Sequence, residues 1–241
     1  MTRGHKRPRA KSVKASFLTL KVGKEAFTDL SPAERGLRRD HAEHVVQVTA
    51  DGGEVTRFEL ADPQFVDFDQ ASGAIAATRH LLDLGHETVW HVAGPPESYA
   101  AERRRKSWQQ TLEEDGREVP PPLIGDWSSR AGYEYGVQLA GDPEVTAVFA
   151  ANDQMALGLL RALHEKGRSV PRDVSVVGFD DMDEAAHLWP PLTTVRQSFD
   201  EVGKRAVAAL LAEITDAGTA GAISVPTEPV VRSSTAAPGP Q

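Results

Sequence analysis

The sequence predicts an α/β fold in which helices cover both faces of a parallel sheet, preceded by a short helix and a β-hairpin. From about residue 65, short apolar runs alternate with segments of helical periodicity. The helical segments are long enough to serve as crossover connections between parallel strands. Apolar runs such as 174–178 have the composition of strands buried between two layers of helices. These observations together favour a sheet with helices on both sides.

Composition places the chain among soluble globular proteins. It has 241 residues, of which 40% are hydrophobic and 26% charged. No apolar run is long enough to cross a bilayer, and no signal-peptide pattern follows the basic start. The chain has no cysteine, which excludes disulfides, thiolate metal sites and cysteine nucleophiles. We therefore expect a cytoplasmic protein that does not engage a membrane.

Charge is unevenly distributed. Eight Lys and Arg residues precede Glu25, the first acid, although the whole chain has 27 basic and 35 acidic residues. This start could attract a nucleic acid phosphate backbone, whereas the acidic remainder should repel one. The alternative is a solvated tail. We expect residues 1–30 to form a disordered, basic arm.

Residues 31–65 are expected to form a helix and a hairpin. Ser31 and Glu34 can form a capping box, and Pro32 suits the first helical position of a helix to about His44. Two alternating runs, 45–49 and 54–60, flank a segment with two glycines and therefore predict a β-hairpin.

The region from 66 to 236 supplies the main α/β elements. Strands are expected at 65–68, 88–92, 123–125, 147–150, 174–178 and 192–195, with an extended segment at 225–232. Helices are expected at 70–84, 97–115, 128–139, 152–167 and 199–214. Gly85 suits the end of the first helix, and Trp108 and Leu112 are the expected inward residues of the second. A loop is expected at 179–191.

Polar and aromatic residues follow several of these strands. Parallel sheets bind ligands beyond the carboxyl ends of their strands, where Trp127, Asn152 and Asp180 are expected. Carboxylates, amides and guanidinium groups can bind the hydroxyls of a sugar or nucleoside, and an indole can cover its apolar face. Arg104 and Gln197 are the candidate donors.

Structural roles for the same residues remain open. Asn152 and Asp153 could cap the following helix, and Trp127 could be part of the core. Asp180 and Asp181 could be an ordinary loop pair.

Enzyme chemistry has little support in the sequence. There is no Gly-x-Ser-x-Gly elbow, P-loop or Gly-x-Gly-x-x-Gly fingerprint. The histidines lack ligand spacing apart from the loose pair His41 and His44, and His86 and His91 are expected to be packed or capping residues. Asp180, Asp181 and Asp183 could hold a divalent ion, but no second acidic motif accompanies them. We expect no catalytic residue, metal or cofactor.

Eight stretches of the region 66–236 resemble the core of the LacI/GalR family of transcription regulators. The similar stretches are Ala71-Ser72-Gly73, His80–His86, Val92–Pro95, Arg103–Trp108, Phe149–Gly158, Asp173–Asp181, Pro190–Gln197 and Pro229–Thr235. Several motifs occurring in the family's order are much more specific than any single one.

The resemblance implies a periplasmic-binding-protein-like type I core, a cytoplasmic homodimer and a small effector, often a sugar, held between two subdomains. By motif, it implies that Arg104 grips effector hydroxyls and that Trp127 stacks on the ligand. It likewise implies that Asn152 supplies an amide, Asp180 is the principal hydroxyl acceptor, and Gln197 lies near the hinge. Effector binding would shift the balance between subdomain arrangements, without catalysis.

Members of this family begin with a DNA-binding helix-turn-helix, and none is visible in residues 1–65. We expect a truncated or rearranged relative, mostly one subdomain, with residues 199–226 belonging to the other. Sequence-specific DNA binding would then be lost, leaving DNA contact to a supplied headpiece or nonspecifically to the basic arm. The alternative is a solute-binding or scaffold protein that dimerises with a full-length relative. A shifted frame or misplaced start is a further explanation for residues 1–65.

Overall fold

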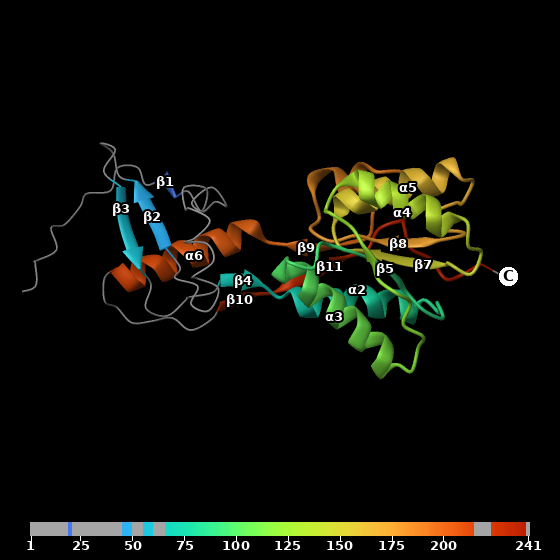
Figure 1. Ribbon diagram of the computed structural model, residues 1–241, viewed down its shortest axis with the longest axis horizontal. Helices are drawn as coiled ribbons and strands as arrows, with labels where there is room; N and C mark the ends of the chain where they lie inside the picture. The colour runs from blue at the N-terminus through green and yellow to red at the C-terminus, as the bar shows by residue number, and fades with distance from the viewer. Residues whose placement is uncertain (1–18, 21–44, 50–54, 60–65, 215–222, 240–241) are drawn as a thin grey trace, which may run out of the picture. The chain divides into compact units, whose positions relative to one another are not determined.

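The computed structural model describes residues 19–20, 45–49, 55–59, 66–214 and 223–239 (Figure 1). The chain divides into two compact units, residues 1–64 and 65–241. In the first unit, strands β1 (Thr19–Leu20), β2 (Val45–Thr49) and β3 (Val55–Glu59) form an antiparallel sheet in that order. The pairing of β2 with β3 confirms the predicted hairpin strands, whereas β1 was not predicted. The predicted helix, the turn at 50–53 and most of the basic arm lie outside the described residues.

The second unit is built around a parallel sheet of four strands in the order β6-β5-β7-β8. The strands are β5 (Trp90–Ala93), β6 (Leu123–Ile124), β7 (Ala147–Ala150) and β8 (Ser175–Val177). Each begins and ends within three residues of its expected position, and the predicted parallel sheet is confirmed.

Helices cover both faces of this sheet (Figure 1). They are α2 (Gln70–Asp83) and α3 (Tyr99–Glu114) on one face, and α4 (Ser129–Ala140) and α5 (Asp153–Glu165) on the other. Side chains alternate along a strand, so Ala147 and Phe149 of β7 pack with α2 and α3, whereas Val148 and Ala150 pack with α4 and α5. The predicted arrangement of layers is therefore confirmed.

Each of these four helices begins at a residue that caps it. The side chains of Asp69, Ser98, Ser128 and Asn152 each accept a hydrogen bond from the backbone N–H three residues later. Within α3, Trp108 and Leu112 are fully buried, as predicted. The Trp108 indole N–H donates to the Val89 carbonyl at 2.8 Å, so its polar atom is satisfied inside the core.

Two glycines allow α4 and α5 to approach closely. A Cβ atom on Gly158 would lie 1.8 Å from the Ser129 carbonyl oxygen, and one on Gly132 would lie 2.0 Å from the Met155 carbonyl oxygen. Neither position has room for any side chain. This contact holds α4 and α5 directly against each other.

The chain then forms two further strand pairs. β9 (Thr194–Gln197) pairs antiparallel with β11 (Thr227–Val230), and β4 (Val66–Phe68) pairs parallel with β10 (Ile223–Val225). Helix α6 (Phe199–Ile214) has the predicted bounds, and Phe199 meets Phe68 edge to face with ring centroids 5.0 Å apart. The loop expected at 179–191 contains a 3-10 helix, η2 (Asp183–His187). In the described part of the chain, no helix is both long and apolar enough to span a membrane.

Candidate functional site

The carboxyl ends of the four parallel strands meet at one edge of the sheet, where polar side chains gather. Trp127 follows β6, Asn152 follows β7 and Asp180 follows β8, while Arg104 reaches this edge from α3. Gly94 follows β5, and a Cβ atom there would lie 2.3 Å from the Trp127 indole. Glycine at this position therefore lets the indole lie directly against the backbone.

Arg104 is the central cation of this edge. Its side chain is 5% exposed, and its Nε donates to Gln70 Oε1 at 2.8 Å. Its Nη1 donates to the carbonyl of Ala151, and its guanidinium lies 3.7 Å from the ring centroid of Phe179. Burial lowers the pKa of Arg104 to about 10, and the charge of Asp180 opposes that fall. Arg104 therefore remains cationic near neutral pH.

Asp180 is held opposite Arg104 by an unusual backbone conformation. Its φ of 115° lies in a region that non-glycine residues rarely adopt, and its N–H donates to the Val195 carbonyl at 2.8 Å. Its Oδ1 lies 3.5 Å from Arg104 Nη2 and accepts a hydrogen bond from Gln197 Nε2. Burial raises the pKa of Asp180, and Arg104 and Gln197 limit the rise.

Gln70 and Gln197 complete a closed ring of side chains. Gln70 Nε2 donates to Gln197 Oε1 at 3.3 Å, so the ring runs from Arg104 through Gln70 and Gln197 to Asp180 and back. Both glutamines are buried, at 4% and 7% exposure. Gln70 was not predicted as a site residue. Its sequence position, directly after the helix cap Asp69, gives no sign of this role.

Asn152 and Trp127 form the opposite side of the site. Asn152 caps α5, because its Oδ1 accepts from the Met155 N–H at 2.9 Å, and its Nδ2 donates to the Trp127 carbonyl and to Gln154 Oε1. Both amide hydrogens are used, but the oxygen retains one lone pair. The ring of Trp127 lies 5.8 Å from the Arg104 guanidinium carbon and also packs against the core.

The structure thus brings all five predicted residues together: Arg104, Trp127, Asn152, Asp180 and Gln197. Asp153 and Asp181, in contrast, are structural carboxylates. Asp153 accepts from Thr194 Oγ1 at 2.6 Å and from the Met182 N–H at 2.9 Å, and burial raises its pKa to about 6. Capping, which the sequence left open for both residues, belongs to Asn152 rather than to Asp153.

Asp181 pairs with two arginine side chains. Its carboxylate pairs with Arg196 at 2.7 Å and with Arg232 at 2.6 Å. Partial burial would raise the pKa of Asp181, but these two guanidinium groups hold it below its usual value. Asp180 and Asp181 therefore point to different partners. Across the residues that the structure describes, no cluster of three metal-ligating side chains is present.

The two lone histidines of the core have structural partners. His86 contacts Thr146 Oγ1 and the Ala236 carbonyl, each at 3.0 Å. His91 is fully buried, contacts the Phe149 carbonyl through Nδ1 at 2.9 Å and stacks on the Phe149 ring. Burial lowers the pKa of His91 to about 3, so it is neutral.

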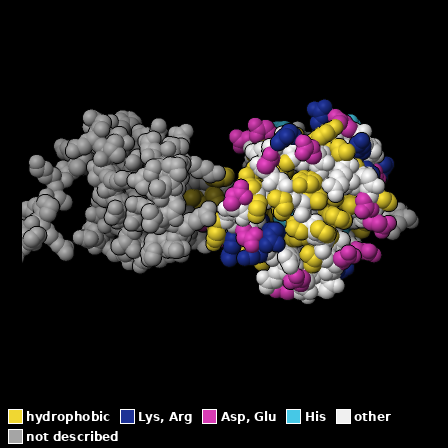
Figure 2. All heavy atoms as spheres, in the orientation of Figure 1, with side chains coloured by type: hydrophobic (Ala, Val, Ile, Leu, Met, Phe, Trp, Pro, Cys, Tyr) yellow, Lys and Arg dark blue, Asp and Glu magenta, His cyan; other side chains and the backbone are white. Residues whose placement is uncertain are grey.

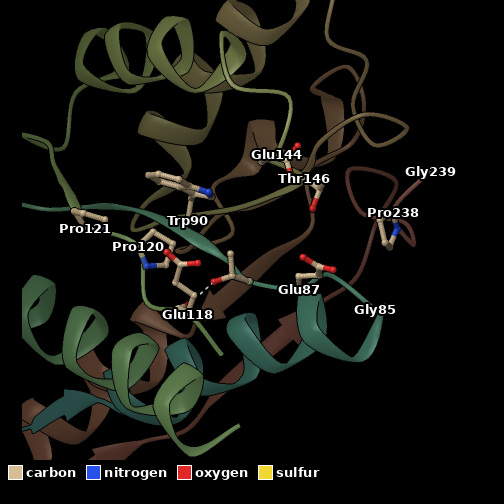
Figure 3. Close-up of a pocket in the computed structure, with 11 residues that line it drawn as sticks. Gly85, Glu87, Trp90, Glu118, Pro120, Pro121, Glu144, Thr146, Pro238 and Gly239 are labelled. Atoms are coloured by element: carbon tan, nitrogen blue, oxygen red, sulfur yellow. Dashed lines mark hydrogen bonds between the residues drawn. The ribbon is translucent and has the colours of Figure 1, made fainter. Parts of the chain in front are cut away.

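Two of the cavities in the described part of this unit lie near different ends of the parallel strands. The larger, about 460 Å³, lies at the amino ends of β5 and β7 beside Trp90, Glu118 and Pro120 (Figure 3). The smaller, about 200 Å³, is lined by residues that begin α2 and α3, including Gln70 of the side-chain ring. The smaller cavity adjoins the candidate site through Gln70, whereas the larger lies at the amino ends of the strands, away from the edge where parallel sheets bind ligands.

Comparisons with known proteins agree with this architecture. Residues 78–235 match the model of the periplasmic binding protein-like domain. The chain is 42% identical to the lactose operon repressor of Klebsiella pneumoniae over 153 residues, which are 63% of this chain and 43% of that protein. It is 36% identical to the lactose operon repressor of Escherichia coli K12 over 175 residues, which are 72% of this chain and 49% of that protein. The chain thus spans a little under half the length of these curated relatives.

Solved structures are similar over the same region. The lac repressor dimer bound to operator and the anti-inducer ONPF has a TM-score of 0.68 and 35% identity, covering 71% of this chain and 60% of that one. The complex of the transcriptional regulator CelR with cellobiose has a TM-score of 0.67 and 35% identity, covering 73% of this chain and 56% of that one.

Proposed function

Because the chain belongs to the periplasmic binding protein-like family and has the effector-binding core of a LacI/GalR regulator, we propose that it is a sensor of a small hydroxylated effector. The effector class is a sugar or a similar polyol. This function needs no catalytic residue, metal or cofactor. The ring of Arg104, Gln70, Gln197 and Asp180 is the observation that carries the proposal.

The ring is suited to hydroxyl recognition because it combines a fixed cation with a fixed anion. A sugar hydroxyl is both a donor and an acceptor, so one hydroxyl can donate to Asp180 while it or its neighbour accepts from Arg104. The 3.5 Å separation of Arg104 Nη2 and Asp180 Oδ1 is too long for a strong hydrogen bond, so an effector hydroxyl would compete with only a weak contact between them. The Trp127 indole would cover the C–H face of the sugar ring. Asn152 Oδ1 would accept a hydrogen bond from one further sugar hydroxyl through its remaining lone pair.

Gln197 would couple effector binding to the relative arrangement of two subdomains. It is the last residue of β9 and stands two positions before α6. We assign α6 and β10, within residues 199–226, to a second subdomain together with β4, since β10 pairs with β4 and Phe199 packs on Phe68. An effector held by Asp180 and Gln197 would favour one arrangement of the subdomains by the difference in its affinity for the two.

Binding can be tested by calorimetric titration of the full chain with a panel of glucose, galactose, ribose and adenosine. We expect at least one sugar to bind, and Arg104→Lys and Asp180→Asn to weaken its binding about tenfold or more, the effect of losing a hydrogen bond to a charged group. Arg105→Lys and Asp183→Asn are the matched controls, because Arg105 pairs with Glu102 and Asp183 is exposed.

The proposal fails if the wild-type chain binds nothing in the panel, or if the two site variants bind as tightly as their controls. Thermal melting of each variant separates lost binding from lost folding.

The chain's partners follow from the same family membership. We propose a cytoplasmic homodimer, in line with the dimeric lac repressor, and light scattering of the purified chain would measure its mass. The basic residues 1–24 would attract DNA nonspecifically. Under the nonspecific model, Arg7→Ala with Arg9→Ala would weaken only salt-sensitive binding. Retention of one defined DNA site at moderate salt, abolished by that double variant, would show specific reading instead.

A further inference from the structure

The larger cavity, at the amino ends of β5 and β7, is not explained by effector binding. Its volume of about 460 Å³ lies within the range of about 300 to 1,000 Å³ that is typical of small-molecule sites. Half-buried Trp90, the first residue of β5, lines it together with Pro120 and Pro121 (Figure 3). These three rings give the cavity an apolar wall, against which a hydrocarbon chain can pack.

Three carboxylates also line this cavity. Glu87, Glu118 and Glu144 are exposed, and each lies in the connection between a helix and the next strand: α2 to β5, α3 to β6 and α4 to β7. Their side chains stand apart around the hollow in Figure 3. In the described part of the chain, no three metal-ligating side chains lie close enough together to hold one ion. Negative charge is therefore distributed around the cavity and not focused at one point.

Within the described ranges, the salt bridges include none of these three carboxylates. Arg117, next to Glu118 in the chain, pairs with Asp115. Figure 2 shows basic side chains gathered over the first turns of α3, whereas the cavity is lined by residues that follow its last turn. No Lys or Arg is among the described residues of the lining. Charge complementarity therefore favours a cationic ligand.

A ligand with several positive charges on an apolar chain matches this lining. Ammonium groups separated by methylene segments can approach different carboxylates at once, while the methylenes cover the proline and indole rings. An ammonium group over the indole face gains a further cation–π attraction. We propose that the cavity binds a linear aliphatic polyamine. A divalent metal ion, in contrast, needs ligands that converge on one point.

The test titrates spermidine, a linear triamine, calorimetrically into the full chain at low salt, with magnesium chloride as the comparison. We expect saturable spermidine binding that weakens as salt is added, because exposed charges are screened. The triple variant Glu87→Gln, Glu118→Gln and Glu144→Gln should bind spermidine about tenfold or more weakly, since each exposed ion pair contributes modestly and three are lost.

A second triple variant controls for nonspecific attraction. The whole chain has a net charge of −8, so any polycation is attracted to it. Glu97→Gln, Glu134→Gln and Glu184→Gln change three other exposed glutamates and give the same net charge as the cavity variant. This control should bind spermidine within about twofold of the wild type. Both triple variants should melt close to the wild-type temperature, because the replaced side chains are exposed.

Tryptophan fluorescence locates the bound polyamine. Spermidine should change the emission of the wild type, Trp90→Phe should remove that change, and Trp189→Phe should retain it, since Trp189 is 92% exposed and does not line the cavity. The proposal is overturned if magnesium binds as tightly as spermidine, if both triple variants weaken binding equally, or if the emission change survives in Trp90→Phe. Sugar titrations of the cavity variant test the effector site separately and should match the wild type.

Discussion

Replacing Gly158 by alanine tests whether α4 and α5 pack as closely as described. The added Cβ would lie 1.8 Å from the Ser129 carbonyl oxygen and 2.7 Å from the Tyr133 nitrogen, both backbone atoms that cannot rotate away. Relief to 3.0 Å requires the helices to separate by at least about 1.2 Å, and overpacking of this kind costs about 1–3 kcal/mol or more. Alanine gains about 1 kcal/mol in helix propensity, which the clash should exceed. Because the clash is with backbone atoms, we expect its cost to fall at the upper end of that range and the net destabilisation to be about 1–2 kcal/mol.

Gly203→Ala in α6 is the matched control, since among the described residues no heavy atom outside its own helix backbone lies within 4 Å of its would-be Cβ. It should gain about 0.5–1 kcal/mol from helix propensity alone. Urea unfolding followed by circular dichroism would give both free energies of unfolding. Equal changes in the two variants, or a Gly158→Ala protein as stable as the wild type, would refute the close packing. Because Asn152 caps α5, Gly158→Ala should also weaken sugar binding.

Three further predictions concern the site and the carboxylates around it. Burial raises the pKa of Asp153 from 3.8 to about 6, so the native state holds this proton more tightly than the unfolded state. The free energy of unfolding should therefore fall by about 3 kcal/mol as pH rises from about 4 to 7, and Asp153→Asn should remove that part of the pH profile; identical profiles would exclude it. Asp181→Asn should cost about 1–3 kcal/mol at pH 7 by leaving half-buried Arg232 without its anion, and a variant of wild-type stability in urea would contradict this. Gly94→Ala should displace the Trp127 indole and weaken sugar binding about tenfold, so an unchanged dissociation constant would show that the indole is not part of the site.

The layers of the fold could be predicted because they depend on local patterns. Apolar runs predicted the four central strands, and helical periodicity predicted helix bounds within a few residues, including both ends of α6. Pairings between distant segments could not be predicted, because nothing local distinguishes the strand at 66–68 as the partner of 223–225. The 3-10 helix at 183–187 was missed because it is too short for a periodic pattern.

The site shows the same division between local and long-range information. The carboxyl-end rule placed Trp127, Asn152 and Asp180 at one edge, since each directly follows a strand. Gln70 was missed because its role depends on contacts with Arg104 and Gln197, which are far away in the sequence. The different partners of Asp180 and Asp181 were equally invisible, because Arg104, Arg196 and Arg232 lie far from them in the sequence.

The central claim is that a hydroxylated effector binds at the carboxyl edge of the parallel sheet. A crystal structure of the chain with the tightest-binding sugar of the panel would test it most directly. We predict sugar hydroxyls within about 3.2 Å of Arg104 and Asp180, with the Trp127 indole against the ring. A sugar found instead in the larger cavity beside Trp90 and Glu118, at the opposite edge, would contradict the account.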